Sequence, residues 1–263
     1  MQRSYGTMVM LLLAALVVCC FATPQNSPAA EESQVDALRV GVTPNYPPMI
    51  FRVNEKITGL EADLARRLGK ELDRPVRFVE LAWDQQITAL LEGKIDIIMS
   101  AMTITDARKV RINFTDPYLK SGLLATIRAG DSAKYNSVKS IVADFPGVGV
   151  IEGTTGEAYV RKNMSKSPRI VKLSKVSDAA SELRSRRVDV FVYDAPAVVW
   201  LVSENEADLR VVRELFSEEY LGWGVRRDDP ELRAKVNAAL ENWKKDGTLK
   251  DTVLRWLPYW KFD

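Results

Sequence analysis

The 263-residue chain has no histidine, and its only cysteines, Cys19 and Cys20, lie near the N-terminus. Without histidine the chain cannot form a Ser-His-Asp triad or an ordinary zinc site. Both cysteines fall in a segment that we expect to be removed, so the mature protein would have neither a disulfide nor thiol chemistry.

Long apolar runs are equally scarce, and Met8–Phe21 is the only stretch of signal-peptide length in the sequence. This run follows Arg3 and is shorter than a comfortable membrane span, a pattern that predicts a signal peptide over residues 1–22. Residues 23–35, rich in Pro, Ala, Ser and Glu, would then be a flexible tether.

A lipid anchor on Cys19 or Cys20 is the alternative fate of this segment. Val18 and Cys19 precede the two candidate cysteines, at positions where Gly, Ala or Ser is usual. The pattern therefore favours a soluble, exported mature protein over a lipoprotein.

The chain also lacks an excess of charge of either sign. Its 37 Lys and Arg against 35 Asp and Glu leave a net charge of +2, and the basic residues are scattered. Nothing in this distribution indicates a nucleic-acid partner. Hydrophobic residues at 46% and charged residues at 27% are usual for a globular protein with a core.

The stretch Leu90–Arg108 reads as a helix end, a turn, a buried strand over Ile95–Met99 and a polar turn. In open α/β sheets, ligands bind just past the carboxyl ends of strands, beside helix N-termini. Thr105 is the expected N-cap, so Arg108 falls in the first helical turn, where the helix dipole disfavours a cation. Its planar fork would suit a bound carboxylate. A surface Arg beside a capping Thr is the alternative.

A second stretch, Leu183–Pro196, repeats this pattern. Val188-Asp189-Val190 matches Ile95-Asp96-Ile97, and the second hydrophobic run ends in Asp194. The repeat predicts two α/β lobes built alike, each presenting a polar strand end. One lobe would supply the cation Arg108 and the other the anion Asp194, which is the charge pattern that holds a zwitterion.

Other strand ends carry candidate pocket residues. Tyr46, on a proline-flanked turn, and Trp83 each follow a predicted strand, where each could line a pocket or pack within its own lobe. The turn Gly153–Gly156 opens a helix, and its free N–H groups could bind an anion although it lacks the P-loop ending. We interpret Glu61 and Asp63 as helix-start charges and not as a catalytic pair.

Hydrophobic periodicity predicts alternating strands and helices. Strands are expected at Leu38–Val42, Val76–Leu81, Leu123–Ile127, Val148–Ile151, Ile170–Leu173, Val188–Val192 and Leu209–Val212. Helices are expected at Leu60–Leu72, Gln86–Leu91, Ser137–Ala143, Ser177–Ser185 with Ser177 as cap, Pro230–Lys245 and Leu249–Trp256. The chain would cross between lobes near Leu124–Arg128 and return over Tyr220–Val225. The first lobe would then comprise residues 36–125 and 222–263, and the second lobe residues 126–221.

Six stretches resemble the periplasmic solute-binding proteins of amino-acid ABC importers (solute-binding family 3). They read LRVGVTPNYPP, GLEADLARRLGKEL, ITALLEGKIDIIMSAMTITDARK, INFTDPYLKSG, VGVIEGTTGEAY and VDVFVYDAP. The resemblance covers about residues 36–260, and the set is specific in this order and spacing although each motif is weak alone. It implies an α/β type II periplasmic-binding-protein fold, in which two lobes, each a sheet flanked by helices, are joined by two hinge strands.

The resemblance also implies the ligand contacts. Arg108 would hold the ligand α-carboxylate, helped by Thr103 and by the backbone at Thr154 and Thr155. Asp194, with Ser100, would hold the α-ammonium, and Tyr46 and Trp83 would pack on the ligand side chain. The full expected set is Tyr46, Trp83, Ser100, Ala101, Met102, Thr103, Arg108, Thr154, Thr155 and Asp194.

The implied protein is a periplasmic monomer that closes around an amino acid and is recognised by the membrane permease. No cofactor, metal or nucleic acid is expected. Two positions depart from particular relatives: Thr43 stands where binders of basic amino acids often carry Asp, and Ile151 replaces a Lys of some glutamine-binding relatives. Glu152 is a spare carboxylate near the expected cleft that would keep a basic ligand possible.

Two other functions stay open. Some proteins of this fold are exported dehydratases acting on prephenate or arogenate, and without histidine such an enzyme would need a carboxyl acid. Glu152, Glu218 and Glu219 are the candidates, and we interpret them as rim residues. The other function is a binding protein that serves a signalling receptor in place of an importer.

Overall fold

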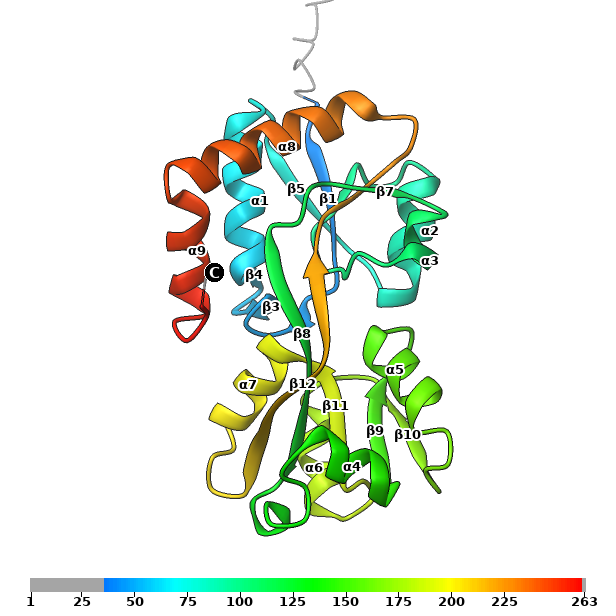
Figure 1. Cartoon of the computed structure of the whole chain (residues 1–263). Helices are drawn as coiled ribbons and strands as arrows, with labels where there is room; N and C mark the ends of the chain where they lie inside the picture. The colour runs from blue at the N-terminus through cyan, green and yellow to red at the C-terminus, as the bar shows by residue number, and fades with distance from the viewer. Residues whose placement is uncertain (1–35, 262–263) are drawn as a thin grey trace, which may run out of the picture. The chain divides into compact units, whose positions relative to one another are not determined.

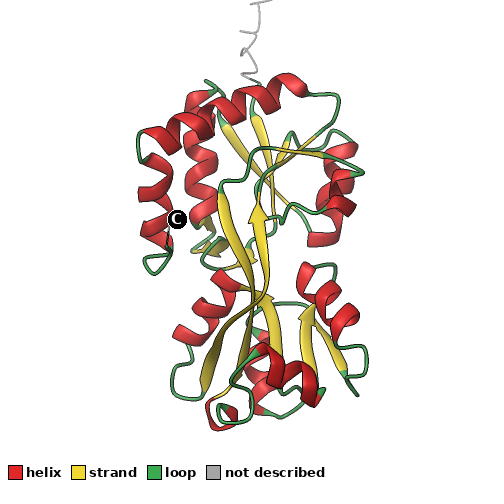
Figure 2. Cartoon of the chain, viewed as in Figure 1, coloured by secondary structure: helices red, strands yellow, loops and turns green. Residues whose placement is uncertain are grey.

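The computed structural model describes residues 36–261, so the predicted signal peptide, the tether and both cysteines lie outside the described residues. Two five-stranded sheets, each flanked by helices, form the body of this part of the chain (Figure 1, Figure 2). We call the part built around the first sheet the first lobe, and the part built around the second sheet the second lobe.

The first sheet has the strand order β5 (Val76–Glu80), β1 (Leu38–Val42), β6 (Ile97–Ile98), β13 (Gly224–Val225) and β7 (Asn113–Phe114). β1 pairs in parallel with β5 and β6, whereas β13 is antiparallel to β6 and β7. Its helices are α1 (Leu60–Glu71), α2 (Gln86–Leu91), α3 (Asp106–Lys109), α8 (Pro230–Lys245) and α9 (Thr248–Trp256). The carboxyl ends of β1 and β6 meet at one edge, which brings the loops after them together.

A small three-stranded sheet follows β1, formed by β2 (Asn45–Tyr46), β3 (Ile50–Val53) and β4 (Lys56–Thr58). This sheet contains the predicted proline-flanked turn, which lies between β2 and β3. It leads into α1, which buries Leu60, Leu64 and Leu68 at the predicted i+4 spacing.

The second sheet has the order β10 (Ile170–Leu173), β9 (Val148–Ile151), β11 (Val190–Asp194), β8 (Leu119–Arg128) and β12 (Leu209–Leu221). β9 pairs in parallel with β10 and β11, and β8 is antiparallel to β11 and β12. Its helices are α4 (Val138–Asp144), α5 (Thr155–Asn163), α6 (Asp178–Arg184) and α7 (Ala195–Ser203). Ser177 stands at the predicted cap of α6, but its hydroxyl makes no cap hydrogen bond.

The paired strands β8 and β12 run from one lobe to the other (Figure 1). The prediction of a short strand ending at Val212 is wrong, because β12 continues to Leu221 after a bulge between Val212 and Ser217. The exposed residues of the bulge interrupt the hydrophobic alternation from which the strand was predicted. Residues on both sides of the bulge nevertheless pair with β8, so the strand is continuous. β8 pairs with β11 of the second sheet from Leu123 onward. The predicted lobe boundary after residue 125 stays a prediction.

The two aspartates of the predicted repeat make the same contacts in their respective lobes. Asp96 N–H donates to Arg39 O at 2.8 Å, and Arg39 N–H donates to Asp96 Oδ2 at 2.8 Å. Asp189 N–H donates to Gly147 O at 2.7 Å, and Gly147 N–H donates to Asp189 Oδ2 at 3.0 Å. Each aspartate therefore joins the starts of two neighbouring parallel strands, which is a structural role.

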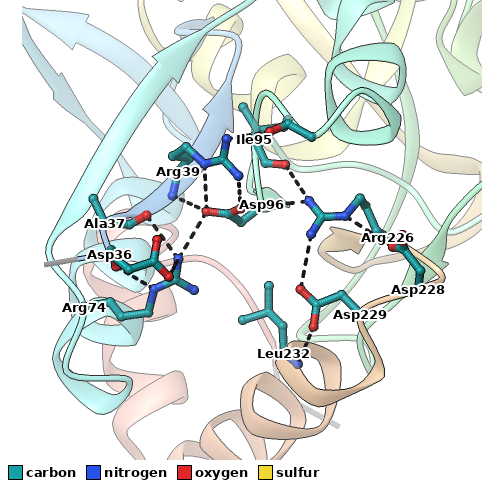
Figure 3. A network of polar contacts seen from close by, with 11 residues as sticks. Asp36, Ala37, Arg39, Arg74, Ile95, Asp96, Arg226, Asp228, Asp229 and Leu232 are labelled. Carbon is teal, nitrogen blue, oxygen red and sulfur yellow. Dashed lines mark hydrogen bonds and ion pairs between the residues drawn. The ribbon is translucent and has the colours of Figure 1, made fainter. Parts of the chain in front are cut away.

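Asp96 lies among three guanidinium groups, those of Arg39, Arg74 and Arg226, of which Arg39 makes the closest contact (Figure 3). Burial alone would raise the pKa of this carboxyl, but hydrogen bonds from Arg39 and the charge of Arg74 hold the pKa below its usual value. Asp36 pairs with the same Arg74 at 3.0 Å, but its side chain is 86% exposed.

We expect Asp96→Ala to lower the free energy of unfolding by about 3 kcal/mol, because it leaves buried donors unpaired. Urea denaturation measures this change. Asp36→Ala is the matched control and should change stability by less than about 0.5 kcal/mol, since its ion pair is exposed. Equal losses in the two variants would contradict a structural role for Asp96.

Candidate functional site

The loop between β6 and α3 carries several of the predicted site residues. Thr105 caps α3 as predicted, since its hydroxyl accepts from Arg108 N–H at 3.3 Å. Ala101 has a φ of 53°, in the left-handed region. Met102 O accepts from Gly222 N–H at 3.1 Å, and Thr103 forms a backbone bridge with Leu221. The loop is therefore fixed directly to the end of β12.

Glu61 holds the other side of this loop. The residue lies in the first turn of α1, as interpreted from the sequence, but it is fully buried. The carboxylate accepts from Ala101 N–H at 2.7 Å, Tyr118 Oη at 2.6 Å and Trp223 Nε1 at 2.8 Å. Burial raises the pKa of Glu61 to about 7, and these three hydrogen bonds oppose the rise. Asp63, on the same helix, accepts from Trp256 Nε1 at 2.9 Å.

Arg108 is half-buried and reaches from the first lobe to the second. Its Nη1 donates to Thr103 O at 2.8 Å and its Nη2 to Gly153 O at 3.3 Å. The guanidinium carbon lies 5.2 Å from the ring centroid of Trp83, whose Nε1 also donates to Gly153 O, at 3.1 Å. Burial lowers the pKa of Arg108, and the carboxylates of Asp194 and Glu219 partly offset this effect. The contact with the Trp83 indole orients the planar guanidinium of Arg108.

Asp194 ends β11 and is 6% exposed. Its Oδ2 accepts from Tyr46 Oη at 2.8 Å, while Oδ1 is buried without a hydrogen-bond partner among the described residues. Burial raises the pKa of Asp194 to about 7 with a further contribution from Glu219, and Tyr46 and Arg108 act in the opposite direction. A buried carboxylate with a free oxygen can accept from a bound cation.

Glu219 is the main residue that sequence reasoning misplaced. We expected it at the rim, but its Oε2 accepts from the hydroxyls of Thr103 at 2.9 Å and Thr155 at 3.0 Å. Its Oε1 accepts from the Ser217 hydroxyl at 3.1 Å. Only the continuous course of β12 brings this carboxylate between the lobes, and that strand was not predicted beyond Val212.

The turn before α5 makes more hydrogen bonds within its own segment than predicted. Thr154 caps the helix, since its hydroxyl accepts from Glu157 N–H at 3.3 Å and donates to Ile151 O at 2.7 Å. Glu157 Oε2 accepts from Gly153 N–H at 2.8 Å. The prediction of free N–H groups in this turn is therefore wrong for Gly153, because the carboxylate of Glu157 in the first turn of α5 accepts from it.

A cavity of about 170 Å³ lies beside these groups and is lined from both lobes. Its walls include the rings of Tyr46, Trp83 and Tyr193, with Tyr46 and Tyr193 in contact at 5.4 Å between centroids. Ser100 also lines it, and its Oγ accepts from Thr43 N–H at 2.9 Å. The buried side chain of Met102 belongs instead to a hydrophobic cluster of the first lobe.

The charge of this cavity bears on its ligand. Among the described residues, those that line it include Lys175 and no carboxylate. Glu152, the predicted spare carboxylate, forms an ion pair with Lys172 instead. No group of three or more acidic side chains in residues 36–261 could hold a metal ion. None of the described helices is both long and apolar enough to span a membrane.

Two α/β lobes joined by paired strands, with a guanidinium and a buried carboxylate between them, define the class of two-lobe ligand-binding proteins. Residues 38–259 match the family model of bacterial extracellular solute-binding proteins, family 3. The chain belongs to this family.

Named relatives support the same class. The chain is 29% identical over 259 residues to the L-cystine-binding protein TcyJ of Escherichia coli K12, covering 97% of this chain and 94% of TcyJ. It is 31% identical over 228 residues to the putative ABC transporter arginine-binding protein 2 of the same strain, covering 84% and 90%. The crystal structure of the ancestral amino acid-binding protein AncCDT-1, a precursor of cyclohexadienyl dehydratase, superposes with a TM-score of 0.78 at 36% identity, covering 84% and 95%.

Proposed function

We propose that the mature chain is a monomeric periplasmic protein that captures an amino acid between its lobes and delivers it to an ABC-importer permease. The observation that carries the proposal is the buried Oδ1 of Asp194, which has no hydrogen-bond partner among the described residues and lies near the guanidinium of Arg108, which itself reaches Gly153 of the second lobe. Arg108 would bind the α-carboxylate, and the free Oδ1 of Asp194 would accept from the α-ammonium. The names of the relatives support an amino-acid ligand.

The ligand side chain would occupy the cavity walled by Tyr46, Trp83 and Tyr193. With Lys175 on its wall and Glu152 paired elsewhere, the described residues that line this cavity offer a second cation no carboxylate partner. We therefore propose a ligand with an uncharged side chain over lysine or arginine. The wall of aromatic rings would pack against apolar parts of that side chain.

Release and capture would use the hinge formed by β8 and β12. Closure around the ligand would favour one relative position of the lobes, and the permease would recognise that form. The backbone pairing of Met102 and Thr103 with the end of β12 gives the ligand loop a direct connection to this hinge.

A dehydratase is the second candidate, favoured by the similarity to AncCDT-1. Two of its candidate acids are engaged elsewhere, since Glu152 pairs with Lys172 and Glu218 pairs with Lys120. Glu219 is engaged as well, since its carboxylate accepts hydrogen bonds from three hydroxyls. We expect no turnover of prephenate or arogenate, and product formation above the Arg108→Ala background would contradict a pure binding role.

A thermal-shift screen of the standard amino acids and L-cystine tests the proposed function. A ligand at about 100 times its Kd stabilises by about 2.7 kcal/mol, which raises Tm by several degrees. We expect shifts with amino acids that have uncharged side chains and smaller shifts with lysine and arginine. The best ligand is then compared with its α-hydroxy acid and its α-carboxamide, each of which lacks one α-charge. Shifts as large with either analogue would contradict recognition of a zwitterion.

A further inference from the structure

Glu219 accepts a hydroxyl hydrogen bond from each lobe, and one of the two donors, Thr103, is a residue that the resemblance assigns to the ligand α-carboxylate. Thr103 belongs to the first lobe and Thr155 to the second, and both hydroxyls donate to one oxygen, Glu219 Oε2. The other oxygen accepts from the Ser217 hydroxyl. The carboxylate is therefore held by one hydroxyl from its own hinge strand and by one from each lobe.

The alternation of β12 explains why Glu219, and not its neighbour, reaches this position. Successive side chains of a strand point to opposite faces. Ser217 and Glu219 share one face, while Glu218 and Tyr220 share the other, where Glu218 pairs with Lys120 at 3.1 Å and accepts from the Tyr220 hydroxyl at 2.9 Å. Glu218 and Glu219 are therefore adjacent carboxylates on one strand, but Glu219 faces the hydroxyls between the lobes and Glu218 faces Lys120 and Tyr220.

The chemistry of a hydroxyl makes these contacts exclusive. A threonine hydroxyl has one proton, so it donates to one acceptor at a time. A ligand carboxylate on Arg108 that also accepts from Thr103 would need the hydroxyl proton that Glu219 now receives. The ligand carboxylate would also approach the Glu219 carboxylate, and two like charges repel each other at hydrogen-bonding distances.

We propose that Glu219 is an internal competitor for the α-carboxylate subsite, bridging Thr103 and Thr155 until a ligand carboxylate replaces it. The inference rests on the proposed function for the identity of the arriving group. Its consequence is that Glu219 holds the lobes together without ligand and lowers the affinity for ligand. A weakly binding internal carboxylate would also disfavour small molecules that lack a carboxylate, because they cannot replace it.

The experiment compares the mature parent protein with Glu219→Gln and Glu218→Gln, which remove the same charge one residue apart. Small-angle scattering without ligand should give a larger radius of gyration for Glu219→Gln than for the other two proteins. Titration calorimetry with the standard amino acids and L-cystine, each tested singly, should give a Kd about tenfold lower for Glu219→Gln. Glu218→Gln should bind within twofold of the parent.

Glu219→Asp provides a second variant in case the glutamine variant fails to fold. It keeps the charge but is one methylene shorter and cannot bridge both threonines, so its radius of gyration should also increase. An unchanged Kd and an unchanged radius of gyration in the Glu219 variants would overturn the proposal. A higher Kd would overturn it as well, because Glu219 would then be a ligand contact.

The two arms separate this inference from the proposed function. If no amino acid binds the parent, the proposed function fails, and the scattering arm still decides whether Glu219 bridges the lobes. If amino acids bind but the Glu219 and Glu218 variants behave alike, only the inference about Glu219 fails.

Discussion

Arg108→Ala should raise the Kd for every amino-acid ligand by at least about a hundredfold, equivalent to about 3 kcal/mol. The guanidinium is oriented by Trp83 at 5.2 Å and by two carbonyl acceptors, so it presents its fork in one direction. An alanine would leave the ligand carboxylate without a charged partner in a partly buried site. Arg108→Lys should lose less, because it keeps the charge without the bidentate geometry.

Titration calorimetry measures this loss, and Arg111→Ala is the matched control. Arg111 lies three residues along the same segment and is exposed. Its removal takes away the same charge outside the cleft, so Kd should change by less than about twofold because exposed charges interact weakly in water. If Arg108→Ala binds as tightly as the parent, the α-carboxylate is not held at this residue.

Ligand affinity should fall at low pH through the protonation of Asp194. Burial raises the pKa of this carboxyl to about 7 in the protein without ligand, Glu219 contributes to the rise, and Tyr46 and Arg108 oppose it. An ammonium binds the ionised carboxylate and lowers its pKa, so ligand binding releases a proton near neutral pH. We expect Kd to be constant above pH 8 and to increase about tenfold for each pH unit below 6.

Whereas ligand affinity should fall at low pH, the stability of the protein without ligand should increase as pH falls. The pKa of Asp194 is about 7 in the folded chain against 3.8 for an ordinary aspartate, so between these values the folded state binds a proton that the unfolded state does not. Stability therefore rises as pH falls from 8 towards 6. Glu61, with a pKa of about 7, contributes with the same sign.

Calorimetry from pH 5 to 8 in two buffers of different ionisation enthalpy measures both Kd and proton release. Asp194→Asn is the matched variant: it should bind far more weakly, release no proton and show a flat pH profile. Its stability should keep the part of the pH dependence that comes from Glu61. A parent Kd that is constant from pH 5 to 8 would show that the ligand does not bind an ionised Asp194.

The local parts of the site could be predicted from the sequence because they depend on neighbouring residues. Thr105 caps α3 beside Arg108, as the spacing of the two residues predicts. The repeat around Asp96 and Asp189 correctly predicted two similar lobes, since both aspartates join the starts of parallel strands. The position of Asp194 at the end of a strand followed from the same repeat.

The parts that failed depend on residues far apart in the chain. Glu61 lies at a polar position of an amphipathic helix, yet Tyr118 and Trp223 cover it. Glu219 follows a bulge that interrupts the pattern of β12, yet it contacts Thr103 and Thr155 from both lobes. Periodicity reports which face of an element is apolar, and it contains no information about which distant donors surround a carboxylate.

The sequence by itself determined the alternation of strands and helices, the duplication into two lobes, and the cation and anion at their strand ends. These follow from hydrophobic spacing and helix capping, which act over a few residues. Only the tertiary structure decided that Arg108 lies against Trp83, that Asp194 Oδ1 has no hydrogen-bond partner within residues 36–261, and that Glu219 contacts both lobes. Such contacts arise from the way β8 and β12 bring the two sheets together, and no local pattern specifies that arrangement.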